Sequence, residues 1–157
     1  MKAIVTGSFD PITLGHMEII KYACEKYETV YVVALINEAK EYMFTMEQKK
    51  RLIELSVKEY ENAVADAYSG MTADYMHQNG ITRIVRGYRN EKDLEYENWL
   101  AEKMQEIDPT FETEIIKCEE KFSQISSTEV RRLIKKGESF CDFVPKAAAD
   151  QIKSYVL

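Results

Sequence analysis

The fold is decided by residues 2–16, KAIVTGSFDPITLGH. The opening segment Lys2–Thr6 is short and rich in residues that favour strands. From Leu14 onward, apolar residues recur at helical spacing, and two glycines, a proline and a histidine lie between the two patterns. In open α/β sheets, ligands bind at the carboxyl ends of strands, where a helix N-terminus offers unpaired N–H groups to an anion. This stretch therefore predicts a phosphate site.

Three residues of the stretch support that prediction. Pro11 disfavours a helical conformation at Asp10 and so delays the start of the helix. Gly15 has no side chain to block a phosphate that approaches the backbone. His16 falls in the first helical turn, beside the same anion. Taken alone, the pattern also describes an ordinary turn before a helix, with a solvated or capping histidine.

The rest of the chain alternates strand and helix patterns. We expect a Rossmann-like, doubly wound, five-stranded parallel sheet with helices on both faces and a helical C-terminal end, in a single domain over residues 1–157. The predicted strands are Lys2–Thr6, Thr29–Leu35, Ala63–Tyr68, Ile81–Arg86 and Glu112–Lys117. The predicted helices are Leu14–Lys26, Met46–Lys58, Thr72–Asn79, Lys92–Glu106, Ser127–Lys136 and Lys146–Ser154.

Helix ends carry recognisable signals. Thr45 and Gln48 have the spacing of a capping box, as do Ser126 and Glu129. Gly80 and Gly137 follow helical patterns, and Pro145 stands where a first helical residue is expected.

Composition narrows the class of protein. Hydrophobic residues at 45% and charged residues at 31% are typical of a globular domain. The three cysteines are scattered and lack metal-site spacing, which favours reduced thiols in an intracellular protein. No apolar run reaches the ~18 residues of a membrane span, and no signal peptide precedes Lys2. We therefore expect a cytoplasmic protein without a membrane partner.

The charge distribution indicates the type of ligand. A net charge of −6 argues against a nucleic-acid partner, for which a basic face is expected. Lys40, Arg86 and Arg89 nevertheless stand in or beside predicted strand ends, whereas we interpret Arg83 as a solvated strand end. An acidic protein with a basic pocket suits a small phosphorylated ligand.

Three motifs match a known family in the right order. Residues 7–16, GSFDPITLGH, resemble the G-[ST]-F-D-P…T-x-G-H start of the nucleotidyltransferase superfamily. Residues 86–97, RGYRNEKDLEYE, resemble the R-G-x-R…D-x-E-Y-E block of the bacterial phosphopantetheine adenylyltransferase family. Residues 125–131, ISSTEVR, resemble the I-S-S-[ST] motif with its following arginine. The chain resembles this family from Met1 to its C-terminal helix.

The resemblance implies roles for individual residues. According to this resemblance, the catalytic residues would be His16, Lys40 and Arg89. The acceptor, 4′-phosphopantetheine, would contact Ser8, Lys40, Thr72 and Arg86. ATP would contact Ser8, Phe9, His16, Gly87, Tyr88, Arg89, Glu97, Phe122, Ser123, Gln124, Ile125, Ser126, Ser127 and Thr128.

Two positions in or near these segments depart from the family pattern. Tyr42 replaces a proline before Met43 and Phe44, which affects the path of the loop that carries Lys40. Gln124 replaces an aromatic residue, which affects contacts to adenine. For Lys40 and Glu97, exposed surface side chains are the structural alternative.

The implied reaction is direct in-line displacement: a phosphate of the acceptor attacks the α-phosphate of ATP, and dephospho-coenzyme A and pyrophosphate form. The acceptor phosphate is already ionised, so the protein supplies positioning and charge stabilisation. We expect Mg²⁺ to arrive on the ATP phosphates, because the sequence has no metal-ligand cluster. The resemblance also implies a homohexamer and feedback binding of coenzyme A.

Alternative functions stay open at this stage. Nicotinamide-mononucleotide adenylyltransferases share the first and last motifs but lack the Arg86–Glu97 block. A cytidylyltransferase is disfavoured because its closing motif has a different form. A nucleotide-binding module without turnover is disfavoured because His16, Lys40, Arg86 and Arg89 are all present.

Overall fold

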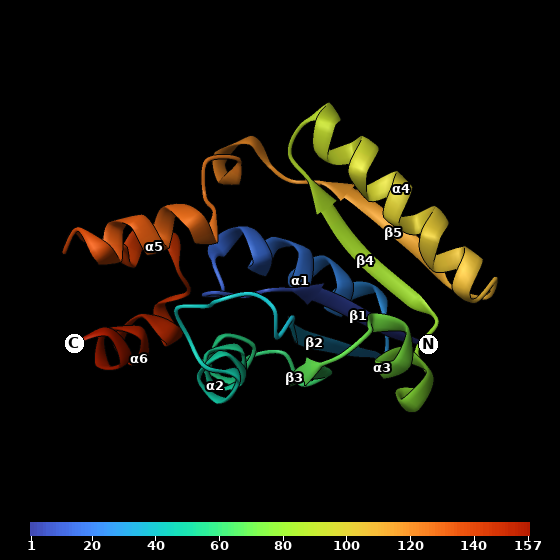
Figure 1. Cartoon of the computed structure of the whole chain (residues 1–157), viewed down its shortest axis with the longest axis horizontal. Coiled ribbons are helices and arrows are strands. Elements are labelled where there is room, and N and C mark those ends of the chain that lie inside the picture. The colour runs from blue at the N-terminus through green and yellow to red at the C-terminus, as the bar shows by residue number, and fades with distance from the viewer.

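The computed structural model describes all residues, 1–157, and is built on one parallel sheet (Figure 1). Its strands are β1 (Lys2–Gly7), β2 (Thr29–Ile36), β3 (Ala63–Ser69), β4 (Arg83–Tyr88) and β5 (Glu112–Lys117). They lie in the order β3-β2-β1-β4-β5, all parallel. The predicted fold class, a doubly wound Rossmann-like sheet, is confirmed.

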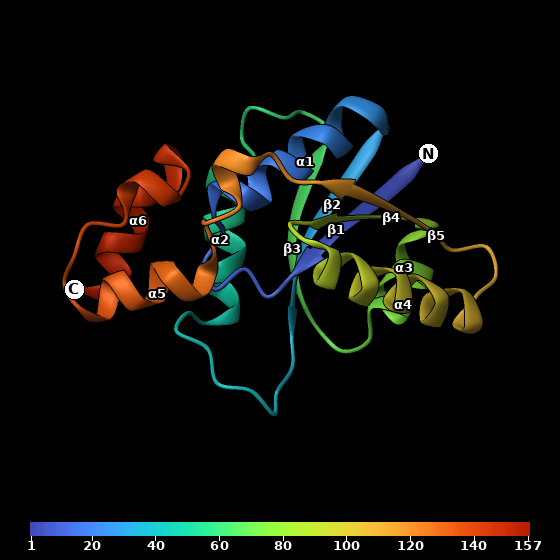
Figure 2. The same ribbon diagram turned by 90° about the horizontal axis from the view of Figure 1, so that it is seen from above.

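Helices cover both faces of the sheet (Figure 2). The helices are α1 (Leu14–Lys26), α2 (Met46–Ser56), α3 (Thr72–Asn79), α4 (Glu91–Ile107), α5 (Ser127–Lys135) and α6 (Lys146–Val156), with short 3₁₀ turns at Glu120–Phe122 and Cys141–Phe143. Helices α1, α2, α5 and α6 share one hydrophobic core with the sheet, and α3 shares the other core with the α4 residue Met104. None of the helices is long and apolar enough to cross a bilayer.

Alternate strand residues explain the two cores. In β1, Ala3 and Val5 point to the α1 side, whereas Ile4 packs on the α3 side. All three side chains are buried, as expected for a central parallel strand covered on both faces.

Several predicted boundaries are corrected by the structure. Strand β4 begins at Arg83 rather than Ile81 and continues through Tyr88, because its pairing with β5 extends to Lys117. Helix α2 ends at Ser56, two residues earlier than predicted. Pro145 is the residue before the first turn of α6 rather than its first helical residue. Helices α1 and α3 and strand β5 have the predicted bounds, and the other element ends differ from prediction by at most two residues.

The capping signals are largely confirmed. Thr45 and Gln48 form the predicted reciprocal cap of α2. Gly80 ends α3 in the left-handed conformation with φ of 66°. At α5, Ser126 caps the amide of Glu129, but the Glu129 side chain pairs with Arg132 instead of returning to the backbone.

Candidate active site

A cavity of about 410 Å³ opens at the carboxyl ends of β1 and β4. The chain adds strands to one side of β1 first and then to the other side, so a topological switch point lies between β1 and β4. Open α/β sheets bind ligands at such a point. The walls come from β1, the start of α1, β4, the first turns of α4, and the segment that joins β5 to α5. Predicted site residues among the lining are Gly15, His16, Arg86, Gly87, Arg89, Glu97, Phe122, Ile125, Ser126 and Ser127.

His16 is held in one orientation at the start of α1. Its Nδ1 accepts a hydrogen bond from the Thr13 amide at 3.0 Å, the role that a glutamate plays in a capping box. The edge of the Phe9 ring packs against it with 4.7 Å between ring centroids. Phe9 itself has a backbone φ of 45°, a region that L-residues rarely adopt.

The surroundings of His16 determine its protonation state. Burial, together with the positive charges of Arg86 and Arg89, lowers the pKa of the imidazole to about 4. The ring is therefore neutral at pH 7. Because Nδ1 accepts a hydrogen bond from an amide, the single proton resides on Nε2. His16 is thus a fixed, neutral hydrogen-bond donor that lines the cavity.

Arg86 is held by two elements. Its Nε and Nη2 donate to the two carboxylate oxygens of Glu97 on α4, each at 2.8 Å. Its Nη1 donates to the carbonyl oxygen and the hydroxyl of Thr6 on β1, at 3.2 and 3.0 Å. Since a guanidinium has five N–H groups, one on Nη2 is left for a ligand. Glu97 is buried, so the structure excludes the exposed-surface alternative for it.

Arg89 follows β4 and is more exposed than Arg86. Its Nη1 donates to the Ser123 carbonyl at 3.4 Å, and its Nε lies 3.5 Å from Asp93. Arg89 therefore bridges the start of α4 and the segment before α5.

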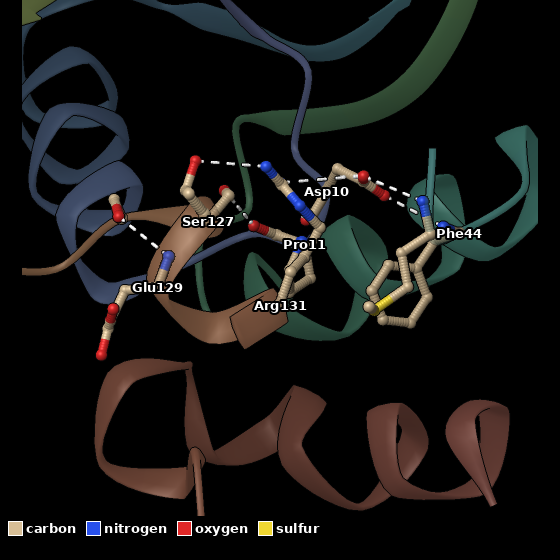
Figure 3. Close-up of polar contacts among 9 residues, drawn as sticks. Asp10, Pro11, Phe44, Ser127, Glu129 and Arg131 are labelled. Atoms are coloured by element: carbon tan, nitrogen blue, oxygen red, sulfur yellow. Dashed lines mark hydrogen bonds and ion pairs between the residues drawn. The ribbon is translucent and has the colours of Figure 1, made fainter. Parts of the chain in front are cut away.

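The start of α5 is tied to the loop after β1 (Figure 3). Ser127 Oγ donates to the Pro11 carbonyl at 2.7 Å, and Arg131 Nη1 donates to the Asp10 carbonyl at 2.8 Å. The buried Asp10 carboxylate in turn accepts from the amides of Met43 and Phe44, each at 3.0 Å. Asp10 thus joins three segments that surround the site.

Two glycines at the site have different tasks. Gly15 lines the main cavity, and a Cβ there would meet Thr13 Oγ1 at 3.5 Å and the Ile125 carbonyl at 3.7 Å, which are ordinary contacts. A Cβ at Gly87 would lie 2.5 Å from Ile19 Cδ1 and 3.0 Å from Cys118 Sγ. Gly87 also lines the main cavity, and its missing side chain makes room for α1.

Lys40 and Ser8 line a neighbouring cavity of about 550 Å³. Its lining also includes Asp10, Glu41, Arg131 and Lys135, so three cations and two carboxylates line this cavity. Lys40 lies on the exposed loop between β2 and α2. The structure therefore places both predicted residues beside the His16 cavity rather than in its lining.

A third cavity, of about 230 Å³, lies on the α4 side of β4. Its walls include the apolar side chains of Leu35, Ile84, Leu100, Ala101 and Met104, together with the predicted residue Thr72. Thr6, Arg86 and Tyr96 line both this cavity and the His16 cavity, which makes the two neighbours.

The other predicted residues lie around the main cavity without lining it: Phe9, Tyr88, Ser123, Gln124 and Thr128. Phe9 supports His16, Ser123 accepts from Arg89, and Thr128 accepts from Arg131. Arg83 lies at the opposite end of β4, paired with Glu112 at 3.3 Å.

Sequence reasoning missed several residues that shape the site. Asp10, Thr13 and Arg131 act through hydrogen bonds, whereas Thr6, Asp93, Tyr96 and Cys118 line the main cavity. Arg131 had a usable signal, because it is part of the I-S-S-T motif with a following arginine.

The residues here do not form a site for a resident metal ion. The only carboxylates that line the main cavity are Asp93 and Glu97, and both are engaged by arginines. No group of three or more acidic, histidine or cysteine side chains is arranged to hold a metal.

The chain matches the cytidylyltransferase-like family over residues 4–133. The chain belongs to this family. The match covers the sheet, the His16 cavity and most of α5, and it identifies the protein as a nucleotidyltransferase.

Solved structures share the fold of this cytidylyltransferase-like chain. One is a putative nicotinate-nucleotide adenylyltransferase from Vibrio parahaemolyticus, with TM-score 0.67 and 18% identity over 94% of this chain and 95% of that one. Another is a bifunctional NMN adenylyltransferase/ADP ribose pyrophosphatase from Francisella tularensis, complexed with AMP and a Mn ion. This match has a TM-score of 0.67 and 16% identity, and it covers 91% of this chain but only 44% of the Francisella chain.

Proposed function

We propose that this nucleotidyltransferase is a pantetheine-phosphate adenylyltransferase, which transfers the adenylyl group of ATP to 4′-phosphopantetheine. The observation that carries the proposal is the cavity beside Arg86. It is small and mostly apolar. The Arg86 guanidinium lines both this cavity and the main cavity. A phosphorylated acceptor whose flexible arm joins methyl and methylene groups through two amides fits that arrangement, with its phosphate near Arg86 and its arm along Leu100 and Met104.

In the proposed reaction, the ATP phosphates lie at the N-terminus of α1 and near the start of α5. An oxygen of the acceptor phosphate attacks the α-phosphorus of ATP, the bond to the bridging oxygen of the β-phosphate breaks, and pyrophosphate leaves. His16 Nε2–H donates to a non-bridging oxygen as charge develops there. Arg89 and the serine-rich turn before α5 stabilise the remaining phosphates.

No protein base is required in this scheme. The acceptor phosphate is already ionised at neutral pH, and the neutral His16 has its Nδ1 engaged with Thr13. Rate enhancement would come from alignment of the two substrates and from fixed donors. We propose that Mg²⁺ binds to the triphosphate and enters with it, as it commonly does when few protein ligands are present.

A second candidate is adenylyl transfer to a nicotinamide or nicotinate mononucleotide. The solved structures of similar fold favour it, because they are adenylyltransferases named for such acceptors. The Arg86–Glu97 block and the apolar lining of the smaller cavity favour phosphopantetheine instead. Feedback binding of coenzyme A and a hexameric assembly stay predictions of the family resemblance.

Pyrophosphate release tests the proposal. The protein is mixed with Mg²⁺ and ATP and then with 4′-phosphopantetheine, nicotinamide mononucleotide or nicotinate mononucleotide, each in turn. A parallel series replaces ATP with CTP. We expect release with ATP and phosphopantetheine alone. Release with a mononucleotide supports the second candidate, and no release in any mixture supports a binding module without turnover.

A further inference from the structure

Lys49, on α2, is a completely buried cation. Its Nζ has no hydrogen-bond partner in the protein, a condition that is costly for an ammonium group. Its Nζ lies over the Tyr42 ring, 3.4 Å from the ring centroid, which is a close cation–π contact. Of the charged groups that face Lys49, Asp10 attracts it and Arg131 repels it. The aromatic ring is therefore the main direct partner of this charge.

The other end of Tyr42 fixes a loop. Its hydroxyl oxygen accepts a hydrogen bond from the Asn37 amide at 3.0 Å. Asn37 closes the turn, since its carbonyl accepts from the Lys40 amide at 2.9 Å and its side chain accepts from the Ala39 amide at 3.0 Å. Lys40 is thus the exposed end of a turn that Tyr42 anchors on one side, while the Glu38 carboxylate accepts from Ser69 Oγ of β3 at 3.0 Å.

The far end of this loop has a separate anchor. The Asp10 carboxylate accepts hydrogen bonds from the amides of Met43 and Phe44. That anchor acts after Tyr42 and does not reach the turn around Lys40. The position of Lys40 therefore depends on the contact between Tyr42 and Lys49 together with the Glu38–Ser69 hydrogen bond.

We propose that Lys49 is a positioning residue: through Tyr42 it tethers the loop of residues 37–42 and thereby holds Lys40 beside the active site. The tether follows from the contacts above, whereas the use of Lys40 by the acceptor rests on the proposed function. A tethered cation loses less conformational freedom when substrate binds, so acceptor affinity increases.

The tether should weaken above neutral pH. Burial lowers the pKa of Lys49 to about 8, with Asp10 opposing the shift and Arg131 adding to it. When the ammonium loses its proton, the electrostatic attraction to the ring is lost. We therefore expect the loop to be held firmly at pH 7 and loosely at pH 9.

Tryptic cleavage after Lys40 measures the tether without any reference to catalysis. The variant Lys49→Met keeps the shape of the side chain and removes its charge, and Lys50→Met is the matched control on the exposed side of α2. We expect Lys49→Met to be cleaved after Lys40 about tenfold faster than wild type at pH 7. The ratio should approach one at pH 9, and Lys50→Met should behave as wild type. Tyr42→Leu removes the aromatic ring from the loop and leaves α2 unchanged, so it should reproduce the faster cleavage. This variant replaces Lys49→Met in the test if Lys49→Met does not fold.

Steady-state kinetics separates the tether from the proposed function. We expect KM for phosphopantetheine to rise in Lys49→Met while KM for ATP is nearly unchanged. Faster cleavage with an unchanged acceptor KM supports the tether and contradicts the acceptor role of Lys40. Cleavage at the wild-type rate in both Lys49→Met and Tyr42→Leu overturns the tether, as does equal acceleration in Lys50→Met.

Discussion

Arg86 on β4 and Glu97 on α4 are joined by two parallel hydrogen bonds of 2.8 Å. This pair fixes the plane of the guanidinium, which would otherwise rotate about a flexible side chain. The Thr6 contacts hold the opposite edge of the same group. As a result, one N–H of Arg86 has a defined direction at the boundary between the main cavity and the apolar cavity.

Replacement of Glu97 should impair the acceptor more than ATP. In Glu97→Gln, the amide accepts at one atom only, so Arg86 loses one of its two orienting bonds. We expect KM for phosphopantetheine to rise about tenfold, which corresponds to the loss of one charge-assisted hydrogen bond. KM for ATP should change little. Glu95→Gln, an exposed position on the same helix, is the control. A larger change in KM for ATP would instead support the ATP contact that the family resemblance implies for Glu97.

Removal of His16 should reduce turnover. Loss of a fixed donor aimed at developing charge costs about 10²-fold in kcat, and ATP affinity should fall much less. Steady-state kinetics of His16→Ala measures both quantities. An unchanged kcat would contradict the role of Nε2–H.

The same variant should change the acid stability of the protein. His16 has a pKa of about 4 in the folded chain and 6.5 as its ordinary value. Between pH 6.5 and 4, the unfolded chain binds a proton that the folded chain does not. The free energy of unfolding therefore falls as pH decreases through this range, by up to about 1.4 kcal/mol per pH unit from this residue.

Urea unfolding at pH 7, 5.5 and 4.5 measures this contribution. His16→Ala should lose less stability than wild type between the first and last pH. Parallel losses in the two proteins would show that His16 titrates normally in the folded state.

Gly87→Ala should be destabilising because of packing. The new methyl group would collide with Ile19 Cδ1 at 2.5 Å and press on Cys118 at 3.0 Å. Overpacking of this kind costs about 1–3 kcal/mol. Adding Ile19→Val removes Cδ1 and should recover part of the loss. Purely additive destabilisation in thermal or urea unfolding would show that the two residues do not compete for this space.

The reaction should invert configuration at phosphorus. Direct attack on the α-phosphorus is a single displacement, whereas a covalent adenylyl-enzyme would require two. The site supports the single step, because its cysteine, Cys118, has a pKa raised by burial and is therefore a poor nucleophile at pH 7. Stereochemical analysis with a chiral α-phosphorothioate of ATP distinguishes the two, and retention would contradict the proposal.

Local patterns were sufficient to predict the architecture. Alternating apolar strands and helices, with glycines and serines at the helix ends, predict every strand and long helix of the structure. The position of His16 also follows from the local order of strand, glycine turn and helix, because that order places it at the carboxyl end of β1.

Contacts between distant segments could not be predicted in the same way. Asp10 binds amides 33 and 34 residues away, and Arg131 reaches back 121 residues to Asp10. These pairs depend on how the loops after β1 and β2 meet the start of α5, which no local period encodes. The tight packing at Gly87 could not be predicted for the same reason, since the side chain that occupies its space belongs to α1.

The role of buried charge was also hidden in the sequence. Lys49 lies in a helix that is rich in exposed lysine and glutamate, so composition predicts a surface residue there. Its burial comes from tertiary packing, in which the ring of Tyr42 covers its ammonium group.

An internal competition tests the central claim most directly. The protein receives ATP, Mg²⁺ and equal concentrations of 4′-phosphopantetheine, nicotinamide mononucleotide and nicotinate mononucleotide in one mixture, and mass spectrometry quantifies the products during early turnover. The product ratio equals the ratio of kcat/KM values. We predict dephospho-coenzyme A in at least about 100-fold excess, because the proposed function places the acceptor phosphate at Arg86 and its arm in the apolar cavity. A dinucleotide as the main product would contradict this account.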